Sequence, residues 1–583
     1  MITLFKNGKI FLGKNKFTDE FAVDDISGKI IYVKGENQKP DTKNEINLKQ
    51  KLVIPSFFDA HCHLFKASQI NSELNLRYAK SKSEFEHEIK KFIKNNKLNS
   101  SVILPAPSES EANTVILSEA KNPILKNQPT PDLSNGGGEY ISVKSTFGSV
   151  SRSIGREFTG RINPYTWISG GYFSDSNITD NFSPDINFLD SVCPDIPLII
   201  SRFDFHSAFI NSKAFELSGL INCVDKFEKE EIIFDSNGKF TGELKERARE
   251  FVLSAIPLKS NEQLADDLKS EIKKLHTLGI TAVSDITLPF DLDIFELLLQ
   301  KNELDLFIDS RLPFTSFYDI NEYKNRFEKF SNKIRFNGFK AFYDGSLSSE
   351  SALMHNNYIN SNTNGLRTEF VNSGDFTKIG NEIHNAGYQI SVHAIGDLAV
   401  TELLDFFESL PASKVNYNTR NRIEHVQHII DKDLDRFKQL GVIASVQPTH
   451  LFSDAKTVSL KYKEIHTTHR YKQLIDRGAM VCFGTDFPIV EENPFETIYY
   501  AMTRKAIGFE NGFLPEYNIP LDECITCYTK NSAYASFTEN QRGKISIGQT
   551  ADFLILEDLF QLNPESLRTQ SPLSTYLSGK KVF

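Results

Sequence analysis

Two histidines one residue apart, His61 and His63, close the apolar run Leu52-Val-Ile-Pro-Ser-Phe-Phe-Asp-Ala-His-Cys-His-Leu64. Side chains alternate faces along a strand, so both imidazoles project to one side while Cys62 points away. Neutral imidazole is a favoured ligand of zinc and related metals, so the pair indicates a metal site in a cavity. Two ordinary polar residues at a strand end would give the same pattern, and further ligands must therefore be sought along the chain.

Three more residues of ligand type end apolar stretches in the same way. His393 ends Gln389-Ile-Ser-Val-His, His425 ends Arg422-Ile-Glu-His, and Asp486 ends Val481-Cys-Phe-Gly-Thr-Asp. Each of them alone is more often an ordinary strand-end residue than a ligand. Five such residues in matching positions instead indicate one shared site.

The elements that would position these residues alternate between strand and helix patterns. Apolar strand candidates lie at residues 281–286, 306–309, 334–342, 388–393, 422–425, 442–447 and 480–486. Strands that alternate with helices form a parallel sheet, and a closed (β/α)8 TIM barrel carries its chemistry at the carboxyl ends of its strands. We therefore predict an α/β fold in which a barrel occupies residues 52–539.

Both ends of the chain have a different sequence pattern, in which short strands are separated by turns. Neither residues 1–51 nor residues 540–583 are numerous enough to bury a core alone, so we expect the two ends to meet in one small β-sandwich domain.

A segment at residues 107–157 has little periodicity and interrupts the predicted barrel. A loop of this length is either a lid or disordered, and its composition favours disorder over a lid.

The composition limits the classes of protein to which the chain can belong. The formal charge of -10 and pI near 5.8 argue against nucleic acid as the main partner. The N-terminus has no apolar signal region, and we find no run of about 18 apolar residues that would cross a membrane, so we expect a cytoplasmic protein. Six cysteines in 583 residues do not form a disulfide framework. Cys524 and Cys527 are expected to be core residues of a helix, with a redox or zinc role as the alternative.

The chain resembles the amidohydrolase superfamily of metal-dependent hydrolases, within the branch that includes N-substituted formamide deformylase. The likeness covers nearly all of the chain apart from residues 107–157. It rests on residues 55–64, 202–213, 339–347, 393–397, 423–425, 445–450 with Ser453 and Asp454, and 484–488. Ser56 stands where this family usually has glycine.

The resemblance implies a barrel with a dinuclear site, most simply two zinc ions, with manganese or iron as alternatives. His61 and His63 would bind the more buried ion, His393 and His425 the more exposed ion, and Asp486 the buried ion and the bridging water. Lys340 matches the bridging lysine of the family and would be carboxylated, because an ammonium group cannot act as a ligand. An unmodified Lys340 beside a single metal is the alternative.

Other residues in or near these motifs are candidates for substrate binding: His206, Trp167, Asp344 and His450. Six further histidines divide into two groups. His87, His276 and His384 follow helical patterns and are expected at the surface, whereas the patterns around His428, His466 and His469 leave their roles open.

These residues predict a metal-dependent amidohydrolase that cleaves a C–N bond of an amide, an N-substituted formamide or a related small molecule. A metal-activated hydroxide would be the nucleophile, and Asp486 would carry its proton to the leaving nitrogen. A deaminase or esterase with one metal, and an inactive barrel that only binds, are the alternatives. The substrate is set by rim loops and cannot be read from the sequence. A homodimer is one oligomeric state that the sequence leaves open.

Overall fold

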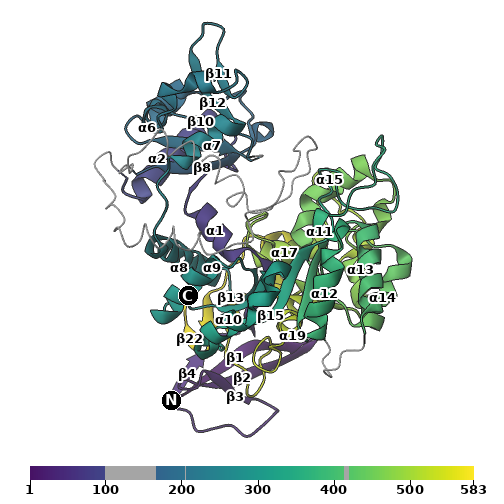
Figure 1. Ribbon diagram of the computed structural model, residues 1–583. Coiled ribbons are helices and arrows are strands. Elements are labelled where there is room, and N and C mark those ends of the chain that lie inside the picture. The colour runs from purple at the N-terminus through teal and green to yellow at the C-terminus, as the bar shows by residue number, and fades with distance from the viewer. Residues whose placement is uncertain (99–165, 204, 412–418) are drawn as a thin grey trace. The chain divides into compact units, whose positions relative to one another are not determined.

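The computed structural model describes residues 1–98, 166–203, 205–411 and 419–583 (Figure 1). The chain divides into two compact units, one of residues 1–67 and 268–583 and the other of residues 68–267. The segment at residues 107–157, for which we predicted disorder, lies outside the described residues.

Eight parallel strands of the described chain form the barrel of the first unit (Figure 1). They neighbour one another in sequence order: β6 (Phe57–Cys62), β13 (Ile280–Ile286), β14 (Phe307–Pro313), β15 (Ile334–Phe342), β16 (Gln389–Ala394), β17 (Arg422–His425), β18 (Ile443–Val446) and β19 (Met480–Phe483). Two hydrogen bonds just beyond β19 join it to β6. The Asp486 amide donates to the His61 carbonyl at 2.7 Å, and the His63 amide donates to the Phe487 carbonyl at 2.9 Å. The predicted TIM barrel is confirmed.

Helices that follow these strands cover the outside of the barrel, as α12, α13 and α14 do in Figure 1. The main ones are α9 (Asp291–Gln300), α10 (Ile320–Arg326), α12 (Asp375–Asn385), α13 (Asp397–Ser409), α14 (Leu434–Leu440), α15 (Leu451–Lys461), α16 (Tyr471–Asp476), α17 (Pro494–Thr503), α18 (Leu521–Tyr528) and α19 (Lys530–Ala535). Helix α13 buries Val400, Leu403, Leu404 and Phe407, a spacing of three and four residues that produces one apolar face.

Two histidines on these helical patterns are not at the surface. His276 is 4% exposed and donates to the carbonyl of Asp305 at 2.7 Å, and His384 is 7% exposed and donates to the carbonyl of Pro411 at 2.9 Å. The expectation of surface positions was wrong for both, because each imidazole satisfies a loop carbonyl next to its helix. His87 is exposed, as predicted.

The interior of the barrel is polar. Arg311 donates to Asp309 at 2.6 Å and Arg422 donates to Glu424 at 2.8 and 3.0 Å, and all four side chains are fully buried. Barrel interiors are commonly filled by branched apolar residues. Here paired charges fill the space below the rim.

Strands from both ends of the chain form the small β domain of the first unit. Its sheet runs in the order β22 (Lys580–Lys581), β21 (Ser574–Leu577), β20 (Phe553–Leu556), β5 (Leu52–Pro55), β1 (Ile2–Gly13), β2 (Lys16–Asp24) and β3 (Lys29–Val33), with β4 (Asn44–Asn47) on β1. Phe5, Phe21 and Phe553 pack in its core. Residues 52–55, which we assigned to the barrel, belong to this sheet, and the hydroxyl of Ser56 bonds to that of Thr281 at 2.5 Å where the barrel begins.

Residues 68–267 form a unit with a sheet of its own, whereas we had assigned residues 52–539 to the barrel with an interruption at residues 107–157. In the described part of this unit the strand order is β11 (Ile232–Phe234), β12 (Phe240–Lys245), β10 (Ser207–Ile210), β9 (Leu198–Arg202), β8 (Ile168–Phe173) and β7 (Leu74–Asn75). Leu198 and Ile200 pack with helices α2 (Lys82–Asn95) and α5 (Ile186–Val192). Ile199 points the other way and packs with α6 (Ser212–Leu217) and α7 (Glu246–Ser254). Helices therefore cover both faces of this sheet.

Two further expectations concern cysteines and membranes. All six cysteines are buried and free, and Cys524 and Cys527 lie in the core on α18. In the part of the chain that the structure describes, no helix has the length and apolar character needed to cross a bilayer.

Candidate metal centre

The end of β6 supplies two imidazoles to the site. His61 is buried, and its Nδ1–H donates to Oε2 of Glu424 at 2.7 Å, which leaves Nε2 facing the site. This Nε2 lies 3.4 Å from Oδ1 of Asp486, and Nε2 of His63 lies 3.2 Å from the same oxygen. The predicted projection of both histidines to one side of the strand therefore brings them to a common carboxylate.

Asp486 follows β19 in a left-handed backbone conformation, with φ of 65°. The preceding Thr485 is held by Asp59 of β6, whose carboxylate accepts the threonine hydroxyl at 2.6 Å and its amide at 3.1 Å. Burial raises the pKa of Asp59 to about 6. Burial also acts to raise the pKa of Asp486, but hydrogen bonds to His61 and His63 outweigh it and hold that pKa well below its usual range, so Asp486 is a carboxylate.

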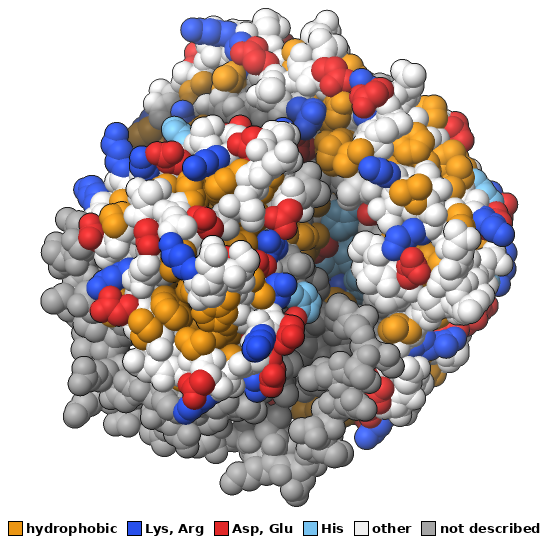
Figure 2. All heavy atoms as spheres, turned by 90° about the horizontal axis from the view of Figure 1, so that it is seen from above, with side chains coloured by type: hydrophobic (Ala, Val, Ile, Leu, Met, Phe, Trp, Pro, Cys, Tyr) orange, Lys and Arg blue, Asp and Glu red, His pale blue; other side chains and the backbone are white. Residues whose placement is uncertain are grey.

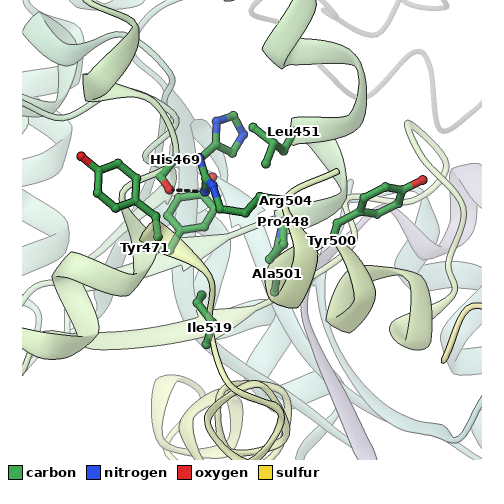
Figure 3. Close-up of a pocket in the computed structure, with 9 residues that line it drawn as sticks. Pro448, Leu451, His469, Tyr471, Tyr500, Ala501, Arg504 and Ile519 are labelled. Atoms are coloured by element: carbon green, nitrogen blue, oxygen red, sulfur yellow. Dashed lines mark hydrogen bonds between the residues drawn. The ribbon is translucent and has the colours of Figure 1, made fainter. Parts of the chain in front are cut away.

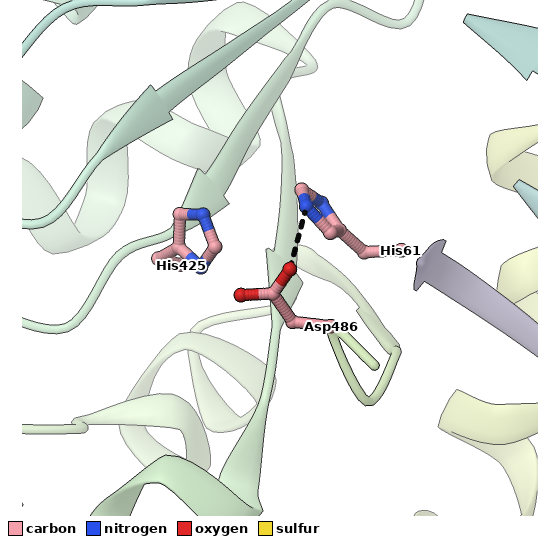
Figure 4. A group of neighbouring side chains, drawn as sticks. All are labelled: His61, His425 and Asp486. Atoms are coloured by element: carbon pink, nitrogen blue, oxygen red, sulfur yellow. Dashed lines mark ion pairs between the residues drawn. The ribbon is translucent and has the colours of Figure 1, made fainter. Parts of the chain in front are cut away.

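His425 enters the site through a break in strand geometry. It has φ of 76°, an uncommon value for a residue other than glycine, and its carbonyl accepts the Tyr471 hydroxyl at 3.0 Å. Its Nδ1–H donates to the amide oxygen of Gln447 at 2.8 Å, so Nε2 is left as the ligand atom. Figure 4 shows that His61, His425 and Asp486 converge from three separate segments. One ligand atom from each lies within 4.8 Å of the others, a separation that suits a shared cation.

His393, at the end of β16, packs beside His425 with 4.5 Å between ring centroids. Its Nε2 donates to the Gly345 carbonyl at 3.2 Å. Burial, followed by the nearby charge of Lys340, lowers the pKa of His393 to about 3. The imidazole is therefore neutral, which is the form that binds metals.

Lys340 lies in the same interior space, on β15, and is 3% exposed. Its Nζ is buried, has no hydrogen-bond partner, and lies 4.8 Å from the ring centroid of Phe342. Burial lowers its pKa to about 8. A buried amine without a partner is costly, so this position fits a modified side chain or one that binds a ligand.

The four residues that we expected to bind substrate do not lie together. The carboxylate of Asp344 accepts backbone amides from Leu353, Ile395 and Gly396 at 2.8 to 3.0 Å, so its oxygens hold two loops together. Nε2 of His450 lies 3.6 Å from Oδ2 of Asp486, inside the site. Trp167 and His206 belong to residues 68–267. Trp167 packs against the core on one face of that unit's sheet, and His206 is exposed.

Sequence reasoning missed the partners of the ligands. Asp59 lies two residues before His61, so the strand alternation that we applied to His61 and His63 places it on the same face. Glu424 lies two residues after Arg422 and faces the interior with it. Gln447 lies beyond the end of β18, where no periodicity marks it.

A small cavity lies next to this region, bounded by His469, Tyr471, Arg504 and neighbouring residues (Figure 3). Its volume is about 10 Å³, room for roughly one water molecule. The guanidinium of Arg504 donates to the carbonyl of His469 at 2.8 Å. This cavity is too small to hold a substrate.

On the surface, Figure 2 shows acidic and basic side chains mixed across the described residues of one face.

Fold and donor set together define a class of protein, the (β/α)8 barrels with imidazole and carboxylate groups gathered at the carboxyl ends of their strands. The chain belongs to the amidohydrolase family, whose model matches residues 44–583. This confirms the family resemblance seen in the sequence. Membership of this family implies a hydrolase that uses a divalent metal.

The chain is similar to several known proteins over most of its length. The chain is 26% identical to the protein LONG AFTER FAR-RED 3 of Arabidopsis thaliana, over 100% of this chain and 91% of that protein. It is 24% identical to N-substituted formamide deformylase of Arthrobacter pascens, over 72% of this chain and 79% of the relative. The solved structure of an uncharacterized metal-dependent hydrolase from Pyrococcus horikoshii has the same fold, with a TM-score of 0.64 and 23% identity over 97% of this chain and 98% of its own.

Proposed function

We propose that this protein hydrolyses a C–N bond of a small amide or N-substituted formamide, with Asp486 as the acid and base. The observation that carries the proposal is the convergence of His61, His425 and Asp486 within 4.8 Å, in a barrel of the amidohydrolase family. The name of the Arthrobacter pascens relative supports N-substituted formamides as the first substrates to test.

The residues present fit divalent cations. His61, His63, His393 and His425 are of the type that binds zinc, Asp486 is an anionic oxygen donor, and Lys340 offers a buried nitrogen without a partner. We propose that these six residues hold two ions, with Lys340 carboxylated as the bridge. The ions, when bound, would acidify a water molecule and polarise the substrate carbonyl.

Asp486 performs the proton transfers in this proposal. Its carboxylate accepts the proton lost by the attacking water and returns it to the nitrogen as the C–N bond breaks, so a carboxylic acid and an amine leave the site. His61 and His63 lie at 3.4 and 3.2 Å from Oδ1, so the two oxygens of Asp486 have different surroundings. The contacts of His61 and His63 are both to Oδ1, so Oδ2 is the better placed for the proton.

Carboxylation of Lys340 follows from its surroundings. A neutral amine adds CO₂ to give a carbamate and releases one proton, and burial favours the neutral amine by lowering its pKa to about 8. The product is an anion among four imidazoles. The carbamate would thus put oxygen atoms where the amine nitrogen Nζ now has no hydrogen-bond partner.

The test is a substrate screen with a metal count. Purified protein loaded with zinc or manganese is assayed against N-substituted formamides, N-acyl amino acids, cyclic amides, aminopurines and simple esters, and metals are measured in the same sample. We expect turnover of a C–N substrate and two ions per chain. Asp486→Asn should keep much of the metal but lose about 10²- to 10⁴-fold in kcat.

Other outcomes decide against the proposal. One ion per chain with turnover of aminopurines or esters favours the mononuclear deaminase or esterase. Tight metal binding with no turnover of any substrate favours an inactive barrel. A metal-replete Asp486→Asn protein with normal kcat would remove Asp486 from the mechanism.

A further inference from the structure

His450 carries a buried hydrogen-bond donor that points into the site and has no partner. The residue is 9% exposed and lies in the short 3-10 turn Pro448–His450 that follows β18. Its Nε2 is fully shielded and makes no hydrogen bond. The nearest acidic oxygen, Oδ2 of Asp486, lies 3.6 Å away, which is too long for one.

The neighbour on the other side of the ring sets which nitrogen carries the proton. The side-chain amide nitrogen of Gln427 lies 3.1 Å from Nδ1 of His450. An amide NH₂ can only donate, so Nδ1 is the acceptor and the proton of the neutral ring sits on Nε2. The main chain of Gln427 is held next to this pair, because its backbone carbonyl accepts the His469 amide at 2.7 Å, and the residue is 4% exposed.

Packing fixes the direction of this donor. The His450 ring stacks on His425 at 6.0 Å between centroids with an angle of 16°. It therefore lies beside the metal-binding group and faces the oxygen of Asp486 that does not contact His61 or His63. Its protonated Nε2 is unsuited to be a ligand, since a ligand nitrogen must offer a lone pair.

We propose that His450 is a catalytic residue whose Nε2–H binds the carbonyl oxygen of the substrate and the negative charge that develops there, and that Gln427 is a positioning residue that fixes this tautomer. The inference rests on the proposed C–N hydrolysis and adds the donor for the oxygen. Water attack forms the new C–O bond and places charge on that oxygen, and His450 donates a hydrogen bond without giving up its proton.

Two measurements besides turnover test the assignment. In protein with ¹⁵N-labelled histidine, NMR should show the Nε2–H tautomer for the signal that disappears in His450→Gln, and Gln427→Leu should shift it toward the other tautomer. Methylphosphonate serves as a tetrahedral anionic probe. Its dissociation constant for the zinc-loaded protein should rise by about 10- to 100-fold in His450→Ala, the effect of losing a hydrogen bond to a charged group.

The matched control is His428→Ala. His428 is also a buried histidine with an unpartnered Nε2, but its Nδ1 contacts Thr467 at 3.2 Å and its ring packs on Tyr462. We expect unchanged phosphonate affinity in this variant. His450→Ala should also keep the wild-type metal content and lose about 10²- to 10³-fold in kcat with little change in KM, while His450→Gln, which keeps an N–H donor, should recover part of the loss.

Several outcomes would overturn the assignment. These are an Nδ1–H tautomer, loss of metal in His450→Ala, no phosphonate binding by the wild type, or equal phosphonate affinity in wild type and His450→Ala. If instead phosphonate binding depends on His450 while the wild type cleaves no C–N substrate, the proposed reaction fails and the donor role of His450 stands.

Discussion

Three histidines of the site are each fixed by a side chain on the ring nitrogen that points away from the centre. Glu424 and Gln447 present oxygens to Nδ1 of His61 and His425, so those rings are protonated there and offer Nε2 as a ligand. Gln427 presents a nitrogen to Nδ1 of His450, so that ring offers Nε2–H as a donor. The partner atom, oxygen or nitrogen, thus separates metal ligands from hydrogen-bond donors of the same residue type.

The first prediction at this scale concerns Glu424. Glu424→Gln keeps the volume but removes the charge that orients His61 and raises its basicity, so metal affinity should fall by about 10- to 100-fold. Competition with a chromogenic chelator measures the metal affinity. Glu402→Gln is the matched control, because Glu402 is paired with Arg367 and Tyr343 away from the histidines and should leave the affinity unchanged. Equal affinities in both variants would make Glu424 a structural partner of Arg422 only.

Lys340 carries the second prediction. Lys340→Ala removes the proposed bridging anion and leaves two cations repelling each other across a short gap, so fewer than two ions should bind and turnover should be nearly lost. Acetate or propionate should partly restore both, since a small carboxylate can enter the space and supply the missing oxygens. Metal content and rate are measured with and without added carboxylate. A variant that retains two ions and normal turnover would reduce Lys340 to a structural residue.

The sequence predicts the ligands better than their partners. His61, His393, His425 and Asp486 all stand at or just past the end of an apolar stretch, and strand ends are visible in a sequence. Gln427 follows two residues of positive φ, His425 and Val426, and Gln447 stands directly before the turn that follows β18. Neither feature follows from local composition, because both depend on contacts between strands distant in the sequence.

At the scale of elements, β17 shows how one strand serves both the interior and the rim. Arg422 and Glu424, two residues apart, both face the interior. In a regular strand the next residue, His425, would face outward. The left-handed conformation of His425 interrupts the alternation, so Glu424 and His425 both face His61. Local backbone strain of this kind is typical of functional sites.

The prediction for this element concerns Arg422, which is fully buried and donates to Glu424, Ser445 and the carbonyl of Ala60. Arg422→Met leaves the buried charge of Glu424 without its guanidinium partner, which should cost about 3–5 kcal/mol of unfolding free energy and weaken metal binding as well. Denaturant unfolding measures the loss. Arg477→Met removes an exposed ion pair to Asp435 and should cost less than about 1 kcal/mol. Similar losses in the two variants would contradict the ionic interior as a source of stability.

Strand patterns predicted the barrel closely but not its boundaries. The candidates at residues 334–342 and 422–425 match β15 and β17, because continuous apolar runs that end in polar residues are specific to buried parallel strands. Residues 52–55 are equally apolar yet pair with β1 and β20. An apolar run shows that a strand is buried without showing which sheet contains it.

At the scale of the whole molecule, the metal ligands and the barrel share one unit, while residues 68–267 form another with their own two-sided core. The sequence did not reveal this division, since residues 168–210 have strand and helix patterns like those of the barrel. Large chains with separate cores need not unfold in a single transition.

The last prediction follows from this division. A cation that binds only the folded barrel stabilises it by about 2.7 kcal/mol at a free concentration of 100 times its Kd, and its ligands join β6 to the strands on the other side of the barrel. Calorimetry should therefore show two transitions, of which only the one that belongs to the barrel moves when the metal is removed with a chelator. His61→Ala should abolish that shift. Phe209→Ala, which truncates a ring that is 2% exposed in the core of residues 68–267, should instead lower only the other transition, since such truncations cost about 3–5 kcal/mol. A single transition that responds to both changes would mean that the two units unfold together.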